Sequence, residues 1–256
     1  MERCCSFVDG HQESYMRDTR ISGPERVPIR DVIDHVAERS AGAPFLLSPE
    51  TQRSVTFREF QRHVARWAQY LVSLGFTKGD KVACLLDNGL FSVELLFGAM
   101  YGGFVPVPLN VVAGPAQVAH TLGHSDARVV FVADEYQQLL TNSIQQIERP
   151  LQIIPADPDA GPEWRGSASK EVTLPHVHED DDALLIYTSG STSQAKGVVF
   201  TQRNLLAGVA NTIAVYQFTP PRSVAVPPAA LPSQCSHRDA PADVAKRWLC
   251  RHAAPV

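Results

Sequence analysis

The segment from Leu184 to Val199 holds the residues whose types and spacing are best suited to chemistry. An apolar stretch leads into a loop of small and hydroxyl-bearing residues, followed by a lysine, a glycine and another apolar pair. Glycine permits positive φ and close approach of backbone N–H groups to an anion, hydroxyls donate without bulk, and an ammonium adds mobile positive charge. These features predict a polyphosphate site that stabilises a leaving pyrophosphate. Its candidate residues are Thr188, Ser189, Gly190, Ser191, Thr192, Lys196 and Gly197.

Two other nucleotide-binding motifs do not fit this segment. The gap from Gly190 to Lys196 matches a Walker A loop, but Ala195 occupies the position of its second glycine. Gly197 stands where that motif needs a hydroxyl for magnesium. No predicted strand is followed by G-x-G-x-x-G, which excludes the dinucleotide-binding fold. Taken alone, a Ser/Thr/Gly loop is also typical of a flexible connector.

The elements before this loop alternate between strands and helices. Apolar runs predict strands at 45–47, 81–86, 104–108, 128–133, 151–154 and 183–187. Helical spacing predicts helices at 29–39, 91–101, 115–122, 135–147 and 204–216, and a further helix that a Thr56–Glu59 capping box opens and Gly75 ends. Residues 155–170 are expected to form a surface linker or long loop, and 179–182 a solvated turn. The pattern predicts an α/β fold, a mostly parallel sheet with helices on both faces.

The whole string from Tyr187 to Val198 resembles the phosphate loop of the adenylate-forming superfamily, which includes acyl- and aryl-CoA synthetases, luciferases and peptide-synthetase adenylation domains. Ten of its twelve positions agree with Y-T-S-G-S-T-G-x-P-K-G-V, counting the free one; Ser193 and Ala195 depart from it. Residues 56–60, 79–83 and 102–110 resemble further motifs of the family in the same order: T-Y-x-E-L, G-D-x-V-A and G-A-x-x-x-P-L-N-P. The resemblance covers about residues 28–219.

This resemblance implies the chemistry of an AMP-forming acid–thiol ligase. ATP and a carboxylic acid would react at Mg²⁺ to give an acyl-adenylate and pyrophosphate, and many members then transfer the acyl group to coenzyme A. Electrostatic stabilisation dominates such a reaction, since its nucleophile is already ionised. By carry-over, Lys196 is the catalytic residue. The residues expected around the ATP phosphates are Thr188, Ser189, Gly190, Ser191, Thr192, Lys196 and Gly197.

The composition is that of an ordinary soluble protein, with 44% hydrophobic and 20% charged residues and a net charge of -4. It provides no basic face for nucleic acid and no apolar span for a membrane. The amino terminus is no secretory signal, and five cysteines without a CxxC pair argue against a disulfide framework or zinc site. We therefore expect a cytoplasmic protein without a transmembrane segment.

Four other residues invite a functional interpretation but are expected to be structural. His120 and His124 have the spacing of zinc ligands, but no H-E-x-x-H glutamate accompanies them, which favours a plain helix surface. Cys84 lies in an apolar strand and Trp67 on an apolar helix face, so both are expected in the core.

Three regions are expected: a loose leader at 1–27, a partial amino-terminal adenylation domain at 28–219 and an aberrant, disordered tail at 220–256. The family is about twice this length, so its adenine site, hinge and carboxy-terminal domain would lie beyond. Residues 228–235 could be encoded by a set of codons that, when read in the frame one base later, gives L-P-L-Y-H-L-N. This string resembles the family's histidine motif. We therefore hypothesise a shifted reading frame near 220–228, and we expect an exposed apolar sheet edge.

Three functions remain open at this stage. The first is the amino-terminal part of an acyl-CoA synthetase of fatty acid metabolism, inactive alone. The second is a non-catalytic nucleotide- or partner-binding fragment. The third is a parent adenylating enzyme that uses an acceptor other than coenzyme A.

Overall fold

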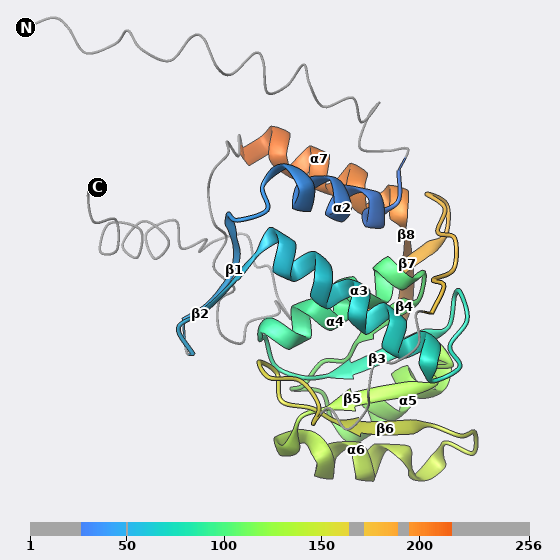
Figure 1. The fold of residues 1–256 in the computed structure, drawn as a ribbon. Coiled ribbons are helices and arrows are strands. Elements are labelled where there is room, and N and C mark those ends of the chain that lie inside the picture. Colours follow the sequence, from blue (N-terminus) through green and yellow to red (C-terminus); the bar gives the residue numbers. More distant parts are fainter. Residues whose placement is uncertain (1–26, 50, 164–171, 189–194, 217–256) are drawn as a thin grey trace, which may run out of the picture.

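The computed structural model describes residues 27–49, 51–163, 172–188 and 195–216 (Figure 1). A hairpin of β1 (Pro44–Ser48) and β2 (Arg53–Thr56) comes early in the chain, after helix α2 (Ile29–Arg39). The remaining elements are α3 (Phe57–Ser73), β3 (Lys81–Leu85), α4 (Leu90–Gly102), β4 (Val105–Pro108), α5 (Pro115–Ser125), β5 (Val129–Val132), α6 (Gln137–Ser143), β6 (Gln152–Pro155), β7 (Asp182–Thr188), β8 (Lys196–Thr201) and α7 (Gln202–Tyr216). Two short 3-10 turns, Asp134–Tyr136 and Ile144–Gln146, flank α6 where one continuous helix was expected.

The centre of the fold is a four-stranded parallel sheet in the order β4-β3-β5-β6. Helices α3 and α4 cover one face, and α5 and α6 cover the other (Figure 1). Successive side chains of a strand point to opposite faces. Thus Val82 and Cys84 pack toward α3 and α4, whereas Ala83 and Leu85 pack toward α5 and α6. The expected α/β fold with a mostly parallel, two-sided sheet is confirmed.

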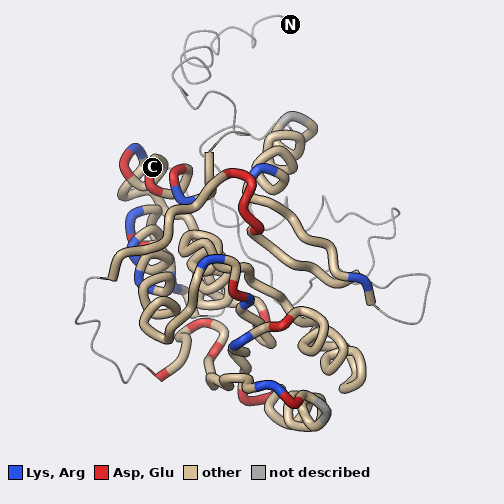
Figure 2. Tube along the Cα trace, turned by 90° about the vertical axis from the view of Figure 1, so that its right-hand side faces the viewer, with Lys and Arg blue, Asp and Glu red and all other residues tan. Residues whose placement is uncertain are grey.

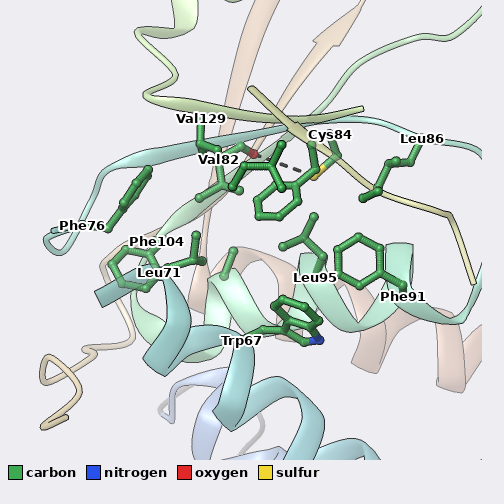
Figure 3. Close-up of a cluster of buried hydrophobic side chains, with 14 of the residues drawn as sticks. Trp67, Leu71, Phe76, Val82, Cys84, Leu86, Phe91, Leu95, Phe104 and Val129 are labelled. Atoms are coloured by element: carbon green, nitrogen blue, oxygen red, sulfur yellow. Dashed lines mark hydrogen bonds between the residues drawn. The ribbon is translucent and has the colours of Figure 1, made fainter. Parts of the chain in front are cut away.

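The core between this sheet and helices α3 and α4 is built from large apolar side chains (Figure 3). Trp67 packs edge-on against Phe91, with ring centroids 4.9 Å apart. The Cys84 thiol is buried in the same cluster, and its burial raises its pKa to about 12. A thiol with such a pKa stays protonated and is a poor nucleophile. Both residues therefore have the structural roles expected of them.

Helix α3 begins and ends as its sequence predicts. The Thr56 hydroxyl accepts a hydrogen bond from the Glu59 amide at 3.3 Å, and the Glu59 carboxylate accepts one from the Thr56 amide at 2.8 Å. This reciprocal pair satisfies two amides at the helix amino terminus that otherwise lack acceptors. Gly75, with φ of 81°, then terminates the helix in the left-handed conformation that glycine adopts without strain.

The segment 155–170 was expected to be a surface linker or long loop, and beyond Pro155 its described part is a loop, but this loop packs against the start of α4. The Asp159 carboxylate accepts a hydrogen bond from the Leu90 amide at 2.8 Å and so caps α4. The Pro158 carbonyl accepts from the Ser92 amide at 3.1 Å. A Cβ on Gly89 would lie 2.2 Å from that carbonyl oxygen, so only glycine allows this approach.

Helices α2 and α7 lie side by side at the edge of the fold above α4 (Figure 1). They share a small apolar cluster of Ile29, Met100 and Leu206. Within the described residues, every helix is too short or too polar to cross a membrane.

Apolar surface remains exposed on the last described strand and helix. The large apolar side chains concerned are Val198, Val199, Val209, Ile213 and Val215, which are 39% to 75% exposed. This agrees with the expected exposed apolar edge. The proposed leader and the tail lie outside the described residues, apart from residue 27, and the boundaries at 28 and 219 stay predictions.

Candidate phosphate-binding site

The candidate site lies at the end of an antiparallel hairpin that β7 and β8 form beside the main sheet (Figure 2). Strand β7 packs against β4, and its Leu185 joins the core on the α5 and α6 side of the sheet. Strand β7 was predicted, but no strand was predicted at 196–201. The hairpin thus places Thr188 and Lys196, which flank the loop, at one end, and Asp182 and Thr201 at the other.

The hairpin register brings the two ends of the loop together. Thr188 lies directly opposite Lys196, and Tyr187 lies opposite Gly197. The side chains of Thr188 and Lys196 are exposed, and Lys196 forms no ion pair with any described residue. The predicted site residues Ser189, Gly190, Ser191 and Thr192 lie outside the described residues. The structure therefore places both edges of the expected anion cradle and leaves its centre as a prediction.

Gly197 lies where a side chain would be tightly packed, and its backbone is not left-handed. Among the described glycines, those with positive φ are Gly75, Gly79, Gly103 and Gly161, so the positive φ expected at Gly197 is not found. A Cβ on Gly197 would lie 3.1 Å from Leu185 Cδ1 and 3.3 Å from Tyr187 Cζ. The absence of a side chain at Gly197 therefore makes room for the Tyr187 ring on the facing strand.

Two histidines of α5 contact both ends of the loop. The Nδ1 atom of His124 lies 2.6 Å from the Tyr187 hydroxyl, and the Nε2 atom of His120 lies 3.0 Å from the Ala195 carbonyl oxygen. Burial, together with the negative charge of Asp126, raises the pKa of Tyr187, so its hydroxyl stays neutral near pH 7. Both histidines lie on the helix surface as expected, but the sequence analysis missed their contacts with the loop. Their i, i+4 spacing was the available signal.

The opposite end of the hairpin starts at the acidic turn predicted for 179–182. Burial raises the pKa of Asp181, but hydrogen bonds from the His178 amide at 2.7 Å and the Lys78 ammonium at 2.9 Å outweigh it and hold the pKa below its usual value. Arg203 at the start of α7 pairs with Glu179 at 3.5 Å and also with Asp180. The turn is thus a structural junction, and Lys78 and Arg203 offset part of its negative charge at the end of the hairpin opposite Lys196.

The described part of the chain holds no group of three or more histidine, cysteine, aspartate or glutamate residues that could bind a metal ion. His120 and His124 accordingly have no third ligand among these residues. At the end of the hairpin, Lys196 with its exposed ammonium is paired with Thr188 and its exposed hydroxyl, which are the types of group that bind anions. The intervening sequence contains further hydroxyl-bearing residues.

Comparison with known proteins identifies the family of this chain. The family model described as AMP-binding enzyme matches residues 33–235. The sulfoacetate–CoA ligase of Cupriavidus necator is 33% identical over 170 residues, which cover 66% of this chain and 33% of that protein. The fatty acid–[acyl-carrier-protein] ligase ScoC of Streptomyces coeruleorubidus is 31% identical over 156 residues, which cover 60% of this chain and 30% of that protein.

Comparison with solved structures also finds an acyl-CoA synthetase. The Mycobacterium tuberculosis fatty acyl CoA synthetase superposes with a TM-score of 0.58 at 27% identity, and the match covers 68% of this chain and 34% of that one. The matched part of the chain thus spans about a third of the length of each protein compared here.

Proposed function

Because this chain belongs to the family of AMP-binding enzymes, we propose that it carries the phosphate loop and the amino-terminal part of an ATP-dependent acyl-CoA synthetase. The reaction joins a carboxylic acid to ATP, releases pyrophosphate, and transfers the acyl group from the adenylate to coenzyme A. The observation that carries the proposal is the hairpin register, which sets the exposed Lys196 opposite Thr188 at the two ends of the loop.

The role of Lys196 follows from its charge and position. Attack of a carboxylate on the α-phosphorus brings two anions together and expels a third, so fixed positive charge at the phosphates lowers the barrier. Lys196 has no competing carboxylate among the described residues and is exposed, so its ammonium is available to a triphosphate. Thr188 would add a hydroxyl donor from the opposite strand.

Three further ligands complete the proposed reaction. Mg²⁺, coenzyme A and the carboxylic acid would bind through residues that we do not assign, because no group of three metal ligands occurs in the described part of the chain. When bound, Mg²⁺ would neutralise phosphate charge in addition to Lys196. The matched part of the chain covers about a third of each of these relatives, so we expect the 256 residues by themselves to bind ATP without catalysing adenylation.

The test measures ATP binding by the 256-residue chain with isothermal titration calorimetry. Loss of one charge-assisted contact predicts that Lys196→Ala weakens binding by roughly tenfold to a hundredfold. Arg58→Ala is the matched control, because it also removes one exposed positive charge, at the start of α3, and it leaves the loop intact. Equal affinities for wild type and Lys196→Ala would remove Lys196 from the phosphate site.

Carboxylate-dependent ATP–pyrophosphate exchange tests the second half of the proposal. We expect no exchange by the 256 residues alone, and exchange by an intact parent protein that Lys196→Ala abolishes. ATP binding to both, with exchange by neither, would favour the alternative of a non-catalytic nucleotide-binding protein.

An acyl carrier protein is the alternative acceptor of the acyl group. One relative supports it, because ScoC is named as a fatty acid–[acyl-carrier-protein] ligase. Supplying coenzyme A or a carrier protein to the intact parent and detecting the acylated product distinguishes the two acceptors.

A further inference from the structure

The residues that flank the loop proposed to hold the triphosphate contact one face of α5. His120 and His124 lie one helical turn apart on that face, with ring centroids 5.7 Å apart. Both rings meet the Tyr187 ring nearly edge-on, at centroid distances of 6.4 and 5.6 Å. The two histidines and the tyrosine thus form one packed group of rings between the helix and the hairpin.

The hydrogen bonds of this group bracket the loop. Tyr187 immediately precedes Thr188, and its hydroxyl contacts His124 at 2.6 Å. Ala195 immediately precedes Lys196, and its carbonyl contacts His120 at 3.0 Å. Each of the two residues that form the described edges of the site is therefore adjacent to a residue held by α5.

The donor and acceptor can be assigned for the hydrogen bond between His120 and Ala195. The hydrogen bond between His124 and Tyr187 can have either direction. A carbonyl oxygen only accepts, so His120 must carry a hydrogen on Nε2 and donate it to Ala195. A phenolic hydroxyl both donates and accepts, so His124 can accept from Tyr187 when Nδ1 is bare or donate to it when Nδ1 is protonated. Asp126 at the end of α5 is a further ionisable group near Tyr187. Both contacts are compatible with either charge state of the histidines.

Helix α5 is itself fixed independently of the hairpin. Its Val118 and Leu122 side chains are buried in the core against the parallel sheet. The Arg149 guanidinium donates to the Leu122 carbonyl at 2.6 Å and also to the Ala127 carbonyl, which ties the end of the helix to the segment before β6. A helix anchored in this way is a rigid support for side chains that must hold a loop.

We propose that His120 and His124 are positioning residues that fix the two ends of the phosphate loop on α5. They hold Thr188 and Lys196 at the separation set by the hairpin, so that less ordering is required when an anion binds. The expected effect of the two histidines on ATP affinity rests on the proposed function. Their effect on the position of the loop ends does not depend on that function and is measured separately.

The first measurement is the rate at which trypsin cleaves the native 256-residue chain after Lys196. Lys196 is the only lysine or arginine between Asp182 and Thr201, so this cut reports the exit of the loop. We expect His120→Ala to accelerate it by about threefold to tenfold, the range that loss of one neutral hydrogen bond allows. Cleavage after the exposed Arg53, on β2, serves as the internal control and should not change.

Matched variants separate the hydrogen bonds from general effects on folding. His120→Gln keeps an amide donor near the position of Nε2, and His124→Asn keeps an acceptor near the position of Nδ1; both should cleave at nearly the wild-type rate. Tyr187→Phe removes the hydroxyl without altering α5 and should reproduce His124→Ala. His176→Ala, at an exposed position outside the site, should have no effect.

The second measurement is ATP affinity by calorimetry, which should fall by about threefold to tenfold in His120→Ala and His124→Ala and recover in the Gln and Asn variants. If wild type binds no ATP but the alanine variants are cleaved faster at Lys196, the proposed function fails while the positioning role stands. Unchanged cleavage at Lys196 in both alanine variants, or equal acceleration in the alanine and the conservative variants, would overturn the positioning role.

Discussion

The side chain of Gln202 is completely buried and joins three helices, which makes it the most informative single position for stability. Its Oε1 atom accepts a hydrogen bond from the Ile29 amide of α2 at 3.1 Å. Its Nε2 atom donates to the Met100 carbonyl of α4 at 3.3 Å. Gln202→Met keeps nearly the same length and volume but removes both bonds, so it isolates hydrogen bonding from packing.

Loss of the two Gln202 hydrogen bonds leaves one partner group satisfied and the other unpaired. The Met100 carbonyl still accepts from the Gly103 amide at 3.1 Å, so it keeps a partner. Ile29 is the first residue of α2, whose amide has no acceptor within the helix, and the residue is only 6% exposed. Leaving that donor unpaired costs about 1–3 kcal/mol, and losing the second bond adds about 0.5–1.5 kcal/mol. Apolar burial of the methionine offsets part of this, so we expect a net loss of about 2–3 kcal/mol.

Urea denaturation followed by far-UV circular dichroism measures this difference. Gln117→Met, at an exposed position of α5, is the matched control and should change the free energy of unfolding by less than about 0.5 kcal/mol. Hydrogen exchange should also become faster at the Ile29 amide in Gln202→Met. A free energy of unfolding within about 0.5 kcal/mol of wild type would refute the assignment of Gln202 as a structural bridge.

Two further predictions concern α4 and its neighbours. Gly89→Ala places a Cβ 2.2 Å from the Pro158 carbonyl oxygen, so the free energy of unfolding should fall by about 1–3 kcal/mol; an unchanged thermal midpoint would contradict this contact. The hydrogen bond from His63 to Glu94 at 2.7 Å raises the pKa of His63. The stabilisation is fully present below the unfolded pKa of about 6.5 and is lost as pH rises through the higher folded value. Glu94→Gln should abolish this pH dependence of the urea midpoint, and its persistence would assign the dependence elsewhere.

The central sheet was predictable because its strands carry a local signal. The segments that became β3 and β5 are continuous apolar runs, which is typical of parallel strands buried on both faces. The helices between them show helical spacing and, at Thr56, a complete capping box. These features depend on neighbours within about four residues, so they can be recognised from the sequence without knowledge of the tertiary fold.

The features that were not predicted depend on contacts between distant segments. Residues 157–161 resemble a linker in composition, yet Asp159 caps a helix that begins 69 residues earlier in the chain. Strand β8 begins beside a Ser/Thr-rich loop, and its Val198 and Val199 are exposed, so it lacks the alternation that marks a half-buried strand. It is defined by its pairing with β7.

At the phosphate loop, local sequence signals and contacts between distant segments both contribute to the structure. The string around Lys196 was recognisable by its residue types, but its placement depends on three positions that belong to different elements. Gly197 leaves space for the Tyr187 ring, and the ring can then direct its hydroxyl to His124 on α5. A Cβ at Gly197 would press on the Tyr187 ring, whose hydroxyl contacts His124, 63 residues away in sequence. The glycine therefore acts on the loop through the tyrosine and the helix beneath it, and not through its own backbone conformation.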